Sequence, residues 1–438
     1  MTGFDGRNAD LEQVLAEARL RYAQRRPRSA AHDREAQASM PGGNTRTVLH
    51  HGPFPLTFLR GEGARLWDAD GLEYRDFLGE YTAGLYGHSN PVIAEAVEHA
   101  LRDGIVLGGR NRHEGELAAL IRARFPSCEL IRFCNSGTEA NLMAIGAARA
   151  FTGRDAVLVF DGAYHGGVLS FAGPSPVTAP YPFVSVPYND AAGAVEAIER
   201  EAGRLAAVLV EPMMGSAGAI PGDPVFLAAL RAATARHGVA LIFDEVMTSR
   251  LSPGGLQGVL GIAPDLTSFG KYLGGGLSFG AFGGRRDILE RFDPRRAGAL
   301  AHAGTFNNNV LSMAAGAAGL SRVYTPERAA DLNARGDRLR DALNAAGRAT
   351  GVPVLATGIG SILGLHVQQG PVRRPADLTT PPAVRELLHL EMIERGFYFA
   401  RRGFLSLSIE TTDRDCADFA AAFREVLSDW GALLGSTS

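Results

Sequence analysis

The sequence predicts an α/β protein built on a mostly parallel sheet, and two features of the chain lead to this fold class. Short apolar runs rich in β-branched residues recur at residues 155–160, 206–212, 239–246 and 266–270. Helical patterns lie between them, for example at residues 191–203 and 224–238. Strands that are apolar throughout and alternate with helices are typical of a parallel sheet covered on both faces. Functional side chains should therefore gather where the carboxyl ends of these strands meet.

Three parts of the chain are expected to fold as separate units. The first, residues 1–75, begins with an amphipathic helix near Asp10 and continues as an irregular arm and a small meander with a turn at Asp70-Gly71. The second, residues 76–322, carries the apolar runs and is the expected large domain. The third, residues 323–438, starts a new helix-then-strand pattern and is the expected small domain.

The composition excludes several classes of function. The 438 residues have a formal net charge of −3, so neither a nucleic acid nor an anionic membrane is an expected partner. A short basic cluster at Arg25–Arg28 is expected to be solvated. No apolar run reaches the ~18 residues that a membrane span requires.

The three cysteines, at positions 128, 134 and 416, form no CxxC pair, which is typical of reduced thiols. The charged N-terminal segment lacks the apolar core of a signal peptide. We therefore expect a cytoplasmic protein. The histidines and cysteines also show no metal-ligand spacing, so no metal is expected.

Lys271 is the only lysine in the chain, whereas all the other members of the 44 basic residues are arginines. It lies in the segment TSFGKYLGGG, between an apolar run and a glycine cluster. A guanidinium stays protonated in proteins, but a desolvated lysine amine can lose its proton and attack carbonyl compounds. A drift in composition toward arginine would explain the arginines but not this position, so a chemical role for Lys271 is favoured.

Two acids, Glu211 and Asp244, lie at the ends of predicted strands near Lys271 in the expected sheet. A buried amine beside a carboxylate could be a structural ion pair. Burying such a pair, however, rarely gives a net gain in stability. A cofactor that uses both groups is the better explanation.

Ser136, Gly137 and Thr138 follow a predicted strand and begin a strongly helical stretch. Free backbone N–H groups and the positive end of the helix dipole bind phosphate at such a position. An ordinary helix cap is the commoner explanation of such a string taken alone. After the run at 155–160, Tyr164 and His165 stand between glycines, where an aromatic ring is suited to stack on a planar ligand, although a lone histidine is usually structural.

A nucleophilic lysine, a phosphate site, an acid and an aromatic platform together describe a site for pyridoxal 5'-phosphate. In this interpretation the cofactor aldehyde forms a Schiff base with Lys271, and the phosphate lies on the helix start. An acid keeps the ring nitrogen protonated, and the protonated ring stabilises the carbanion that forms when an amino acid loses a proton.

The chain also carries the segments NSGTEANLMAI, YHG, VEPMMG, FDEVMTSR, FGKYLGGGLSFGAFGG and GTFNNN. With these motifs it resembles, over nearly its whole length, the class III aminotransferases of fold type I, which include the glutamate-1-semialdehyde aminomutases. The resemblance implies a large domain with a mostly parallel, seven-stranded sheet flanked by helices, and a smaller α+β domain formed from both termini.

The resemblance implies a role for each matching residue. Lys271 would be the Schiff-base lysine, and Asp244 would be the partner of the ring nitrogen. Ser136, Gly137 and Thr138 would hold the phosphate.

Four more residues complete the implied cofactor site. Tyr164 and Val246 would pack on opposite faces of the ring, and Glu211 would lie on the side of the ring hydroxyl. Thr305 would reach the phosphate of the neighbouring subunit, which implies a homodimer with shared active sites.

The segments MPGGNTRTVL, EYTAGLYGHS, FNNNV and RRGF look closest to β-amino-acid aminotransferases of the β-phenylalanine type. This resemblance implies that Arg46 and Arg402 bind substrate carboxylates, for which a guanidinium offers bidentate geometry, and that Tyr81 belongs to the same substrate site. Arg401 is the alternative to Arg402, because the alternation of a strand would point only one of them inward.

The predicted activity is therefore transfer of the amino group of an aromatic or aliphatic β-amino acid, such as β-phenylalanine, to 2-oxoglutarate or pyruvate. A glutamate-1-semialdehyde aminomutase is one alternative, but the sequence departs from the aminomutase motifs around Ser249 and Asn307. A non-catalytic protein that binds pyridoxal phosphate is a second alternative. The glycine-rich residues 358–364 suggest a nicotinamide dehydrogenase, but this string precedes a strand-like run instead of opening a helix.

Overall fold

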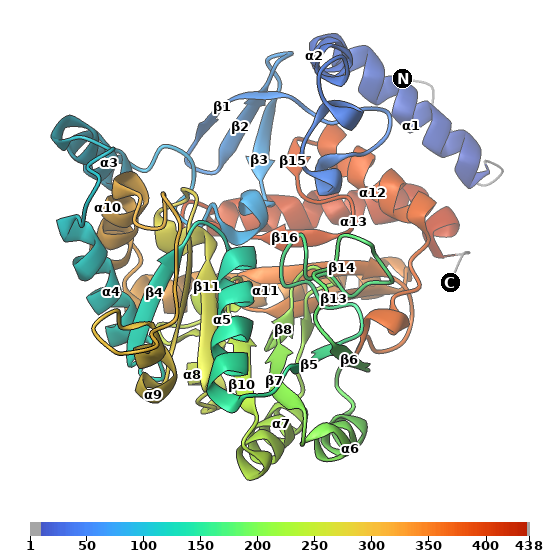
Figure 1. The fold of residues 1–438 in the computed structure, drawn as a ribbon. Coiled ribbons are helices and arrows are strands. Elements are labelled where there is room, and N and C mark those ends of the chain that lie inside the picture. The colour runs from blue at the N-terminus through green and yellow to red at the C-terminus, as the bar shows by residue number, and fades with distance from the viewer. Residues whose placement is uncertain (1–9, 436–438) are drawn as a thin grey trace.

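The computed structural model describes residues 10–435, and a seven-stranded sheet forms its centre (Figure 1). The strands lie in the order β4-β12-β11-β10-β7-β5-β6. β12 is antiparallel to both of its neighbours, whereas the pairs from β11 to β6 are parallel. This mostly parallel sheet confirms the fold class predicted from the sequence. The strands span Leu130–Cys134 (β4), Ala156–Phe160 (β5), Phe183–Val186 (β6), Leu205–Val210 (β7), Ala240–Asp244 (β10), Leu266–Gly270 (β11) and Gly280–Gly284 (β12).

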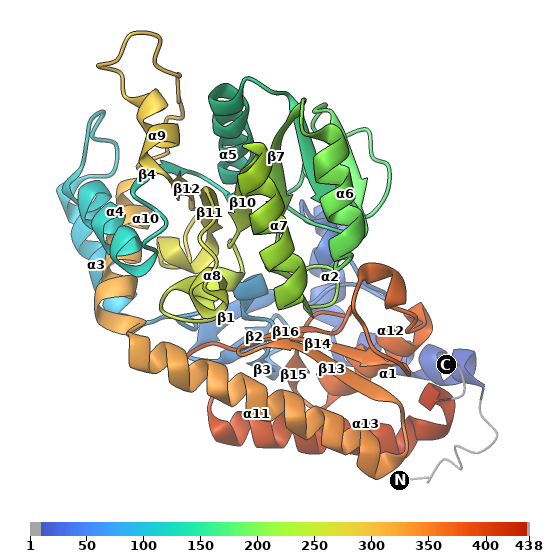
Figure 2. The ribbon, with the colours of Figure 1, turned by 90° about the horizontal axis from the view of Figure 1, so that it is seen from below.

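Helices cover both faces of this sheet, because successive side chains of each strand point to opposite sides. Val157 and Val159 of β5 pack in the core beneath α5, whereas Leu158 and Phe160 pack in the core beneath α6 and α7. Figure 2 shows α5 on one side of the strands and the other two helices on the opposite side. The helices span Gly137–Thr152 (α5), Ala191–Glu201 (α6) and Pro224–His237 (α7).

The ends of these helices follow from local sequence. The Ser136 hydroxyl caps α5 by accepting the Glu139 N–H, and the helix ends at Gly153, whose backbone is left-handed. Asp223 and Gly238 bound α7 in the same way. The caps satisfy backbone groups that have no partner within the helix.

Both ends of the chain contribute to a second sheet, of order β1-β2-β3-β15. β15 comes from the C-terminal part of the chain and runs parallel to β3. The Asp68 carboxylate accepts the N–H groups of Asp70 and Leu72, which closes the predicted turn between β2 and β3. The meander expected from the sequence is therefore confirmed. The strands span Phe58–Glu62 (β1), Arg65–Asp68 (β2), Glu73–Asp76 (β3) and Phe397–Tyr398 (β15).

The N-terminal helices are α1 (Leu11–Arg25), with Asp10 as its N-cap, and α2 (Pro27–Gln37). The prediction that the basic cluster is solvated is wrong for Arg26, which is buried. Its guanidinium donates to the Tyr74 hydroxyl at 2.8 Å and to the Glu394 carboxylate. The local sequence does not reveal this burial, because the carboxylate that compensates it lies far along the chain.

The C-terminal part contains a three-stranded sheet of order β13-β14-β16 and three long helices. Residues 358–364 lie in the β13-β14 hairpin, in which Ile359 pairs with Ile362. They open no helix, so the structural context of a nicotinamide site is missing there. The elements span Pro326–Thr350 (α11), Val354–Ile359 (β13), Ile362–Val367 (β14), Pro382–Glu394 (α12), Phe404–Ser406 (β16) and Asp413–Gly435 (α13). The division of the chain at residues 75 and 322 stays a prediction.

The remaining elements surround the large sheet. α10 packs against α3 and α4, and α4 also contacts the edge strand β4. Among residues 10–435, no helix is both long and apolar enough to cross a membrane. These elements span Pro91–Asp103 (α3), Arg112–Arg124 (α4), Met213–Met214 (β8), Ile220–Pro221 (β9), Gly255–Leu260 (α8), Arg286–Leu289 (α9) and Val310–Ala318 (α10).

Gly336 allows α11 to approach the β13-β14 hairpin, and this contact can be tested. A Cβ atom at this position would overlap the carbonyl oxygen of Gly360, so Gly336→Ala must push the helix and the hairpin apart. We expect the free energy of unfolding, measured by urea denaturation, to fall by ~1–3 kcal/mol. The matched control is Gly146→Ala in α5, where a Cβ would meet nothing within 4 Å. That variant should be neutral or more stable by ~0.5–1 kcal/mol, and equal stabilities of the two variants would contradict the interpretation.

Candidate functional site

The carboxyl ends of several strands meet at one edge of the seven-stranded sheet. Asp244 is the last residue of β10, Glu211 directly follows β7, and Lys271 directly follows β11. The parallel pairing of β10 with both β7 and β11 places these ends side by side. The fold thus groups an amine and two carboxyl groups that are far apart in the sequence.

Lys271 has an unusual backbone and an unpartnered amine. Its φ of 57° is left-handed, a conformation that costs a non-glycine residue free energy and persists only where the surroundings hold it. Within residues 10–435 its amine has no hydrogen-bond or ion-pair partner. Burial, chiefly, lowers the pKa of the amine from 10.5 to about 8; the nearby Arg46 and Arg402 also lower it, while Glu80 and Asp244 raise it.

The Asp244 carboxylate is held by three groups. One oxygen accepts the Asn141 side-chain N–H at 2.8 Å and lies 2.8 Å from Nδ1 of the buried His165. The other oxygen accepts the Val246 backbone N–H at 3.0 Å. Asn141 is fixed in turn by the Ser268 hydroxyl, which donates to its amide oxygen at 2.6 Å. This network leaves the carboxylate with one orientation at the strand end.

Sequence reasoning missed Asn141, and it noted His165 only as a weak signal. Asn141 is a buried polar residue on the otherwise apolar face of α5, one turn beyond the helix start. Buried polar side chains are expected to be hydrogen-bonded. The polar residue in this apolar face could therefore have indicated a buried hydrogen-bond partner. The identity of its partner, Asp244, depends on the packing of α5 against β10.

Glu211 braces the segment that carries Tyr164. Its carboxylate accepts the backbone N–H of Tyr164 at 3.0 Å and that of Gly215 at 2.9 Å. Burial raises the pKa of Glu211 to about 7, and the negative charge of Asp244 adds to the rise. The carboxyl group is therefore close to the balance between its neutral and charged forms near pH 7.

The start of α5 serves both as a cap and as a group of free donors. Ser136 accepts the N–H of Glu139, as a cap does, while the N–H groups of Gly137 and Thr138 in the first turn have no acceptor within the helix. The Thr138 hydroxyl accepts the Gly167 N–H at 3.3 Å, which ties this turn to the segment after β5. The interpretation of this segment as a helix cap is thus compatible with its interpretation as a phosphate site.

Val246 lies between the helix start and the end of β11. A Cβ at Gly137 would lie 2.8 Å from one Val246 methyl group, and a Cβ at Gly270 would lie 3.1 Å from the other. Both glycines therefore provide the room that this valine side chain occupies beside Lys271.

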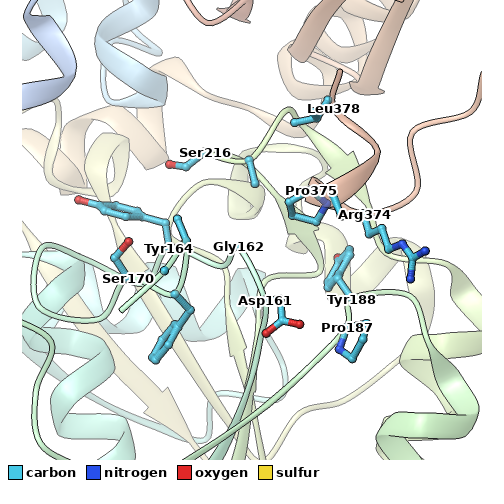
Figure 3. A pocket seen from close by; sticks show the side chains of 15 residues that line it. Asp161, Gly162, Tyr164, Ser170, Pro187, Tyr188, Ser216, Arg374, Pro375 and Leu378 are labelled. Atoms are coloured by element: carbon cyan, nitrogen blue, oxygen red, sulfur yellow. The ribbon is translucent and has the colours of Figure 1, made fainter. Parts of the chain in front are cut away.

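Tyr164 borders an open cavity of about 720 Å³ (Figure 3). The exposed fraction of this residue is 46%, unusual for a large aromatic residue next to a buried strand. The opposite wall comes from the segment before α12, where Pro375 packs on Gly162. Other side chains that line the cavity include Asp161, Ser170, Phe171, Tyr188, Ser216, Arg374 and Leu378.

Two predicted arginines lie close to one predicted tyrosine. The guanidinium carbons of Arg402 and Arg46 lie 4.9 and 5.5 Å from the centre of the Tyr81 ring. Arg46 forms an ion pair with Glu80, which the sequence did not indicate. Nε of Arg402 is buried without a hydrogen-bond partner in the described part of the chain.

The alternative arginine of this pair points elsewhere. Arg401 lies 3.8 Å from the Glu386 carboxylate in α12 and is exposed. The structure therefore places Arg402, and not its neighbour, beside Tyr81.

Thr305 is not brought to this group. It is exposed, and within residues 10–435 no hydrogen bond joins it to another predicted site residue. Its loop is nevertheless linked to the start of α5, because Asn307 accepts the Asn135 side-chain N–H at 3.0 Å. Asn307 also lies 3.2 Å from His302, which fixes the loop from the other side.

The residues at this edge fit an aldehyde cofactor that carries a phosphate. Within residues 10–435 the Lys271 amine has no partner and belongs to a strained backbone, and the Asp244 carboxylate has a single orientation. The N–H groups in the first turn of α5 can donate hydrogen bonds to an anion. Among the described residues, no group of three or more histidines, cysteines or acids is arranged to hold a metal ion.

Comparison with known proteins agrees with this geometry. A family model described as aminotransferase class-III matches residues 48–389. Over 430 residues the chain is 54% identical to the β-phenylalanine transaminase of Variovorax paradoxus, an alignment that covers 98% of this chain and 99% of that protein. It is 37% identical over 428 residues to a glutamate-1-semialdehyde 2,1-aminomutase of Sorangium cellulosum (strain So ce56), with 93% and 97% covered.

The fold also matches a solved structure. The crystal structure of a β-phenylalanine aminotransferase from Variovorax paradoxus has a TM-score of 0.95 and 53% sequence identity, covering 97% of this chain and 99% of that one. These similarities confirm the resemblance to class III aminotransferases that the sequence motifs indicated.

Because Lys271 is the only lysine, the ionisation of its amine can be measured directly. With a pKa of about 8, the amine of the cofactor-free protein should become reactive as the pH rises through about 8, since only the neutral form is nucleophilic. Competitive labelling with an amine-reactive anhydride, followed by mass spectrometry of the peptide that contains Lys271, gives this midpoint. The denatured chain is the control and should show a midpoint near 10.5. A midpoint near that value in the folded protein would contradict the desolvation of the site.

Proposed function

Because this chain belongs to the class-III aminotransferases, we propose that it transfers the amino group of a β-amino acid to a 2-oxo acid. The observation that carries the proposal is the unpartnered Lys271 amine at the sheet edge that also holds Asp244 and the start of α5. The 54% identity to a β-phenylalanine transaminase supports β-phenylalanine or a related aromatic or aliphatic β-amino acid as the donor. The expected acceptors are 2-oxoglutarate and pyruvate.

The cofactor of this enzyme is pyridoxal 5'-phosphate. When bound, it supplies an electron sink for the electron pair that remains when the amine-bearing carbon of the donor loses a proton. Each predicted residue has a proposed place around it: Lys271 for the aldehyde, Asp244 for the ring nitrogen, Ser136, Gly137 and Thr138 for the phosphate, Tyr164 and Val246 for the two ring faces, and Glu211 for the side of the ring hydroxyl.

Lys271 is the proposed proton carrier. An amine with a pKa of about 8 is neutral in part at neutral pH, so its Nζ can accept a proton from the donor carbon and deliver it again. A surface lysine with a pKa near 10.4 would be almost entirely protonated under the same conditions. Asp244 complements it, because the hydrogen bonds from Asn141 and Val246 keep its carboxylate directed at one point.

Arg46 and Arg402 are the proposed carboxylate-binding groups. Within residues 10–435, Arg402 has a buried Nε without a hydrogen-bond partner, and the exposed Glu80 is the one ion-pair partner of Arg46. A guanidinium binds a carboxylate through two parallel hydrogen bonds. Two such groups beside Tyr81 would serve a donor with one carboxylate and an acceptor such as 2-oxoglutarate with two.

We also propose a cytoplasmic homodimer in which Thr305 contacts the phosphate of the partner subunit. Ile105, Val106 and Leu107 are exposed apolar residues, and so is Phe306 beside Thr305. The two segments adjoin, because the Asn308 side chain donates to the Gly109 carbonyl at 3.2 Å. Exposed apolar patches of this kind mark protein–protein contacts. Three free, buried cysteines support the cytoplasm as the location, which cell fractionation would test.

The proposed reaction predicts that β-phenylalanine is consumed only when a 2-oxo acid is added. Formation of glutamate from 2-oxoglutarate, or of alanine from pyruvate, measures the turnover. Lys271→Arg keeps the positive charge but removes the proton carrier, so the rate should fall at least ~100-fold. Conversion of glutamate-1-semialdehyde without an acceptor would indicate an aminomutase instead. Cofactor absorbance without turnover of any donor would indicate a binding protein.

The proposed dimer predicts a native mass twice that of one chain. Val106→Asp should weaken the association at least ~10-fold and lower the activity, because it places an unpaired charge in an apolar contact. Analytical ultracentrifugation over a range of protein concentrations measures the native mass and the strength of association, and the transamination assay measures the activity. Val225→Asp in α7, another highly exposed valine away from the patch, is the matched control. A dimer that Val106→Asp and Val225→Asp affect equally would contradict this interface.

A further inference from the structure

Arg250 is a buried arginine without a carboxylate partner. It ends the short 3-10 helix Thr248–Arg250 that follows β10, and its side chain is fully buried. Within residues 10–435 no carboxylate lies within ion-pair distance of its guanidinium, and burial lowers the pKa of this group. A buried charge without a counter-ion is costly, so a purely space-filling role would be served better by an apolar side chain.

The guanidinium of Arg250 donates hydrogen bonds to two segments that come from opposite ends of the chain. One acceptor is the backbone carbonyl of Thr82, at 3.4 Å. The others are the Ser406 hydroxyl, at 3.1 Å, and the Leu407 carbonyl. Its own carbonyl oxygen accepts the Tyr324 hydroxyl at 2.6 Å, which anchors the arginine itself.

The first of these segments has a strained backbone. All four residues of the turn Gly79–Thr82 are left-handed, with φ values of 52°, 45°, 53° and 81°. Such conformations cost non-glycine residues free energy and persist only where neighbouring groups impose them. The carbonyl that Arg250 holds belongs to the last residue of this turn, so the guanidinium restrains its C-terminal end.

The two segments together present the surface formed by Arg46, Tyr81 and Arg402. Tyr81 lies in the strained turn, and the adjacent Glu80 pairs with Arg46. In the other segment, β16 begins with Phe404, whose ring stacks on Tyr81 with centres 5.8 Å apart. Arg402 lies two residues before it and above the same tyrosine.

We propose that Arg250 is a positioning residue that sets the relative placement of Tyr81 and Arg402, and thereby the affinity of the site for substrate carboxylates. This inference rests on the proposed function of that surface. One rigid guanidinium spans both segments, so the two halves of the surface cannot shift independently. A positioning role affects the binding of carboxylates without touching the groups that move protons, so KM should change and kcat should not.

The variants follow from the hydrogen bonds. Arg250→Met removes all of these hydrogen bonds. Arg250→Lys keeps the positive charge but loses the planar guanidinium and its several N–H donors, and Ser406→Ala removes one acceptor. The matched control is Arg154→Met. Within residues 10–435 the Arg154 guanidinium donates to the backbone carbonyls of Leu205, His237 and Gly238, at the far end of the large sheet.

The holoenzyme is assayed with β-phenylalanine, and binding is measured separately with 3-phenylpropanoate, a carboxylate that lacks the amine. In Arg250→Met we expect KM for β-phenylalanine and Kd for 3-phenylpropanoate to rise at least ~10-fold, with Arg250→Lys intermediate and Ser406→Ala raised ~3-fold. The kcat should stay within about threefold of the wild-type value. The affinity for pyridoxal 5'-phosphate should not change, and Arg154→Met should leave all four quantities unaltered.

The inference is overturned if Arg250→Met and Arg154→Met lose thermal stability alike while KM and Kd remain at wild-type values, because Arg250 then serves only stability. If Arg250→Met does not fold, Ser406→Ala decides, and an unchanged Kd overturns the inference. A wild-type protein that binds 3-phenylpropanoate but does not transaminate β-phenylalanine refutes the proposed donor alone, since the Kd values still test Arg250. A wild-type protein that binds no 3-phenylpropanoate refutes this inference as well.

Discussion

Partial burial of the Lys271 amine, beside strands that are themselves fully buried, underlies the other features of this sheet edge. Burial is the largest cause of the lowered pKa of this amine, and the sheet provides that burial: every residue of β10, β11 and β12 is buried. The Asp244 carboxylate is buried at the same edge of the sheet. Asn141, His165 and the Val246 N–H are partners of that carboxylate. Within residues 10–435 the Lys271 amine at the same sheet edge has no such partner.

Two stretches of left-handed backbone carry groups of the proposed site. Lys271 and the turn Gly79–Thr82 are both left-handed, and each is held by tightly packed surroundings. Lys271 is held by the rigid strand before it, whereas the turn depends on contacts from other parts of the chain, including Arg250. The proposed carboxylate-binding surface therefore combines segments from both ends of the chain, and our proposal is that its affinity depends on how those segments are joined.

Much of this arrangement was predictable because it depends on local sequence. Apolar runs predicted the strands, the Ser136 cap and Gly153 set the ends of α5, and the sole lysine identified Lys271. The errors and omissions share a cause. Arg26 is buried against Glu394, and Asn141 binds Asp244. Arg250 donates to Thr82 and Ser406. In each of these pairs the two residues lie more than a hundred positions apart in the sequence. No local pattern encodes such partners.

The sequence alone was enough to predict the fold class and to single out Lys271 and Asp244 as the proposed nucleophile and acid, because periodicity and residue chemistry act over a few neighbouring positions. The choice of Arg402 over Arg401 required the tertiary structure, since only the packing of α12 shows that Arg401 meets Glu386. The pKa of Lys271 and the orientation of Asp244 were likewise decided by folding. Desolvation and hydrogen-bond geometry are properties of the assembled interior, where groups distant in sequence come within a few ångströms of each other.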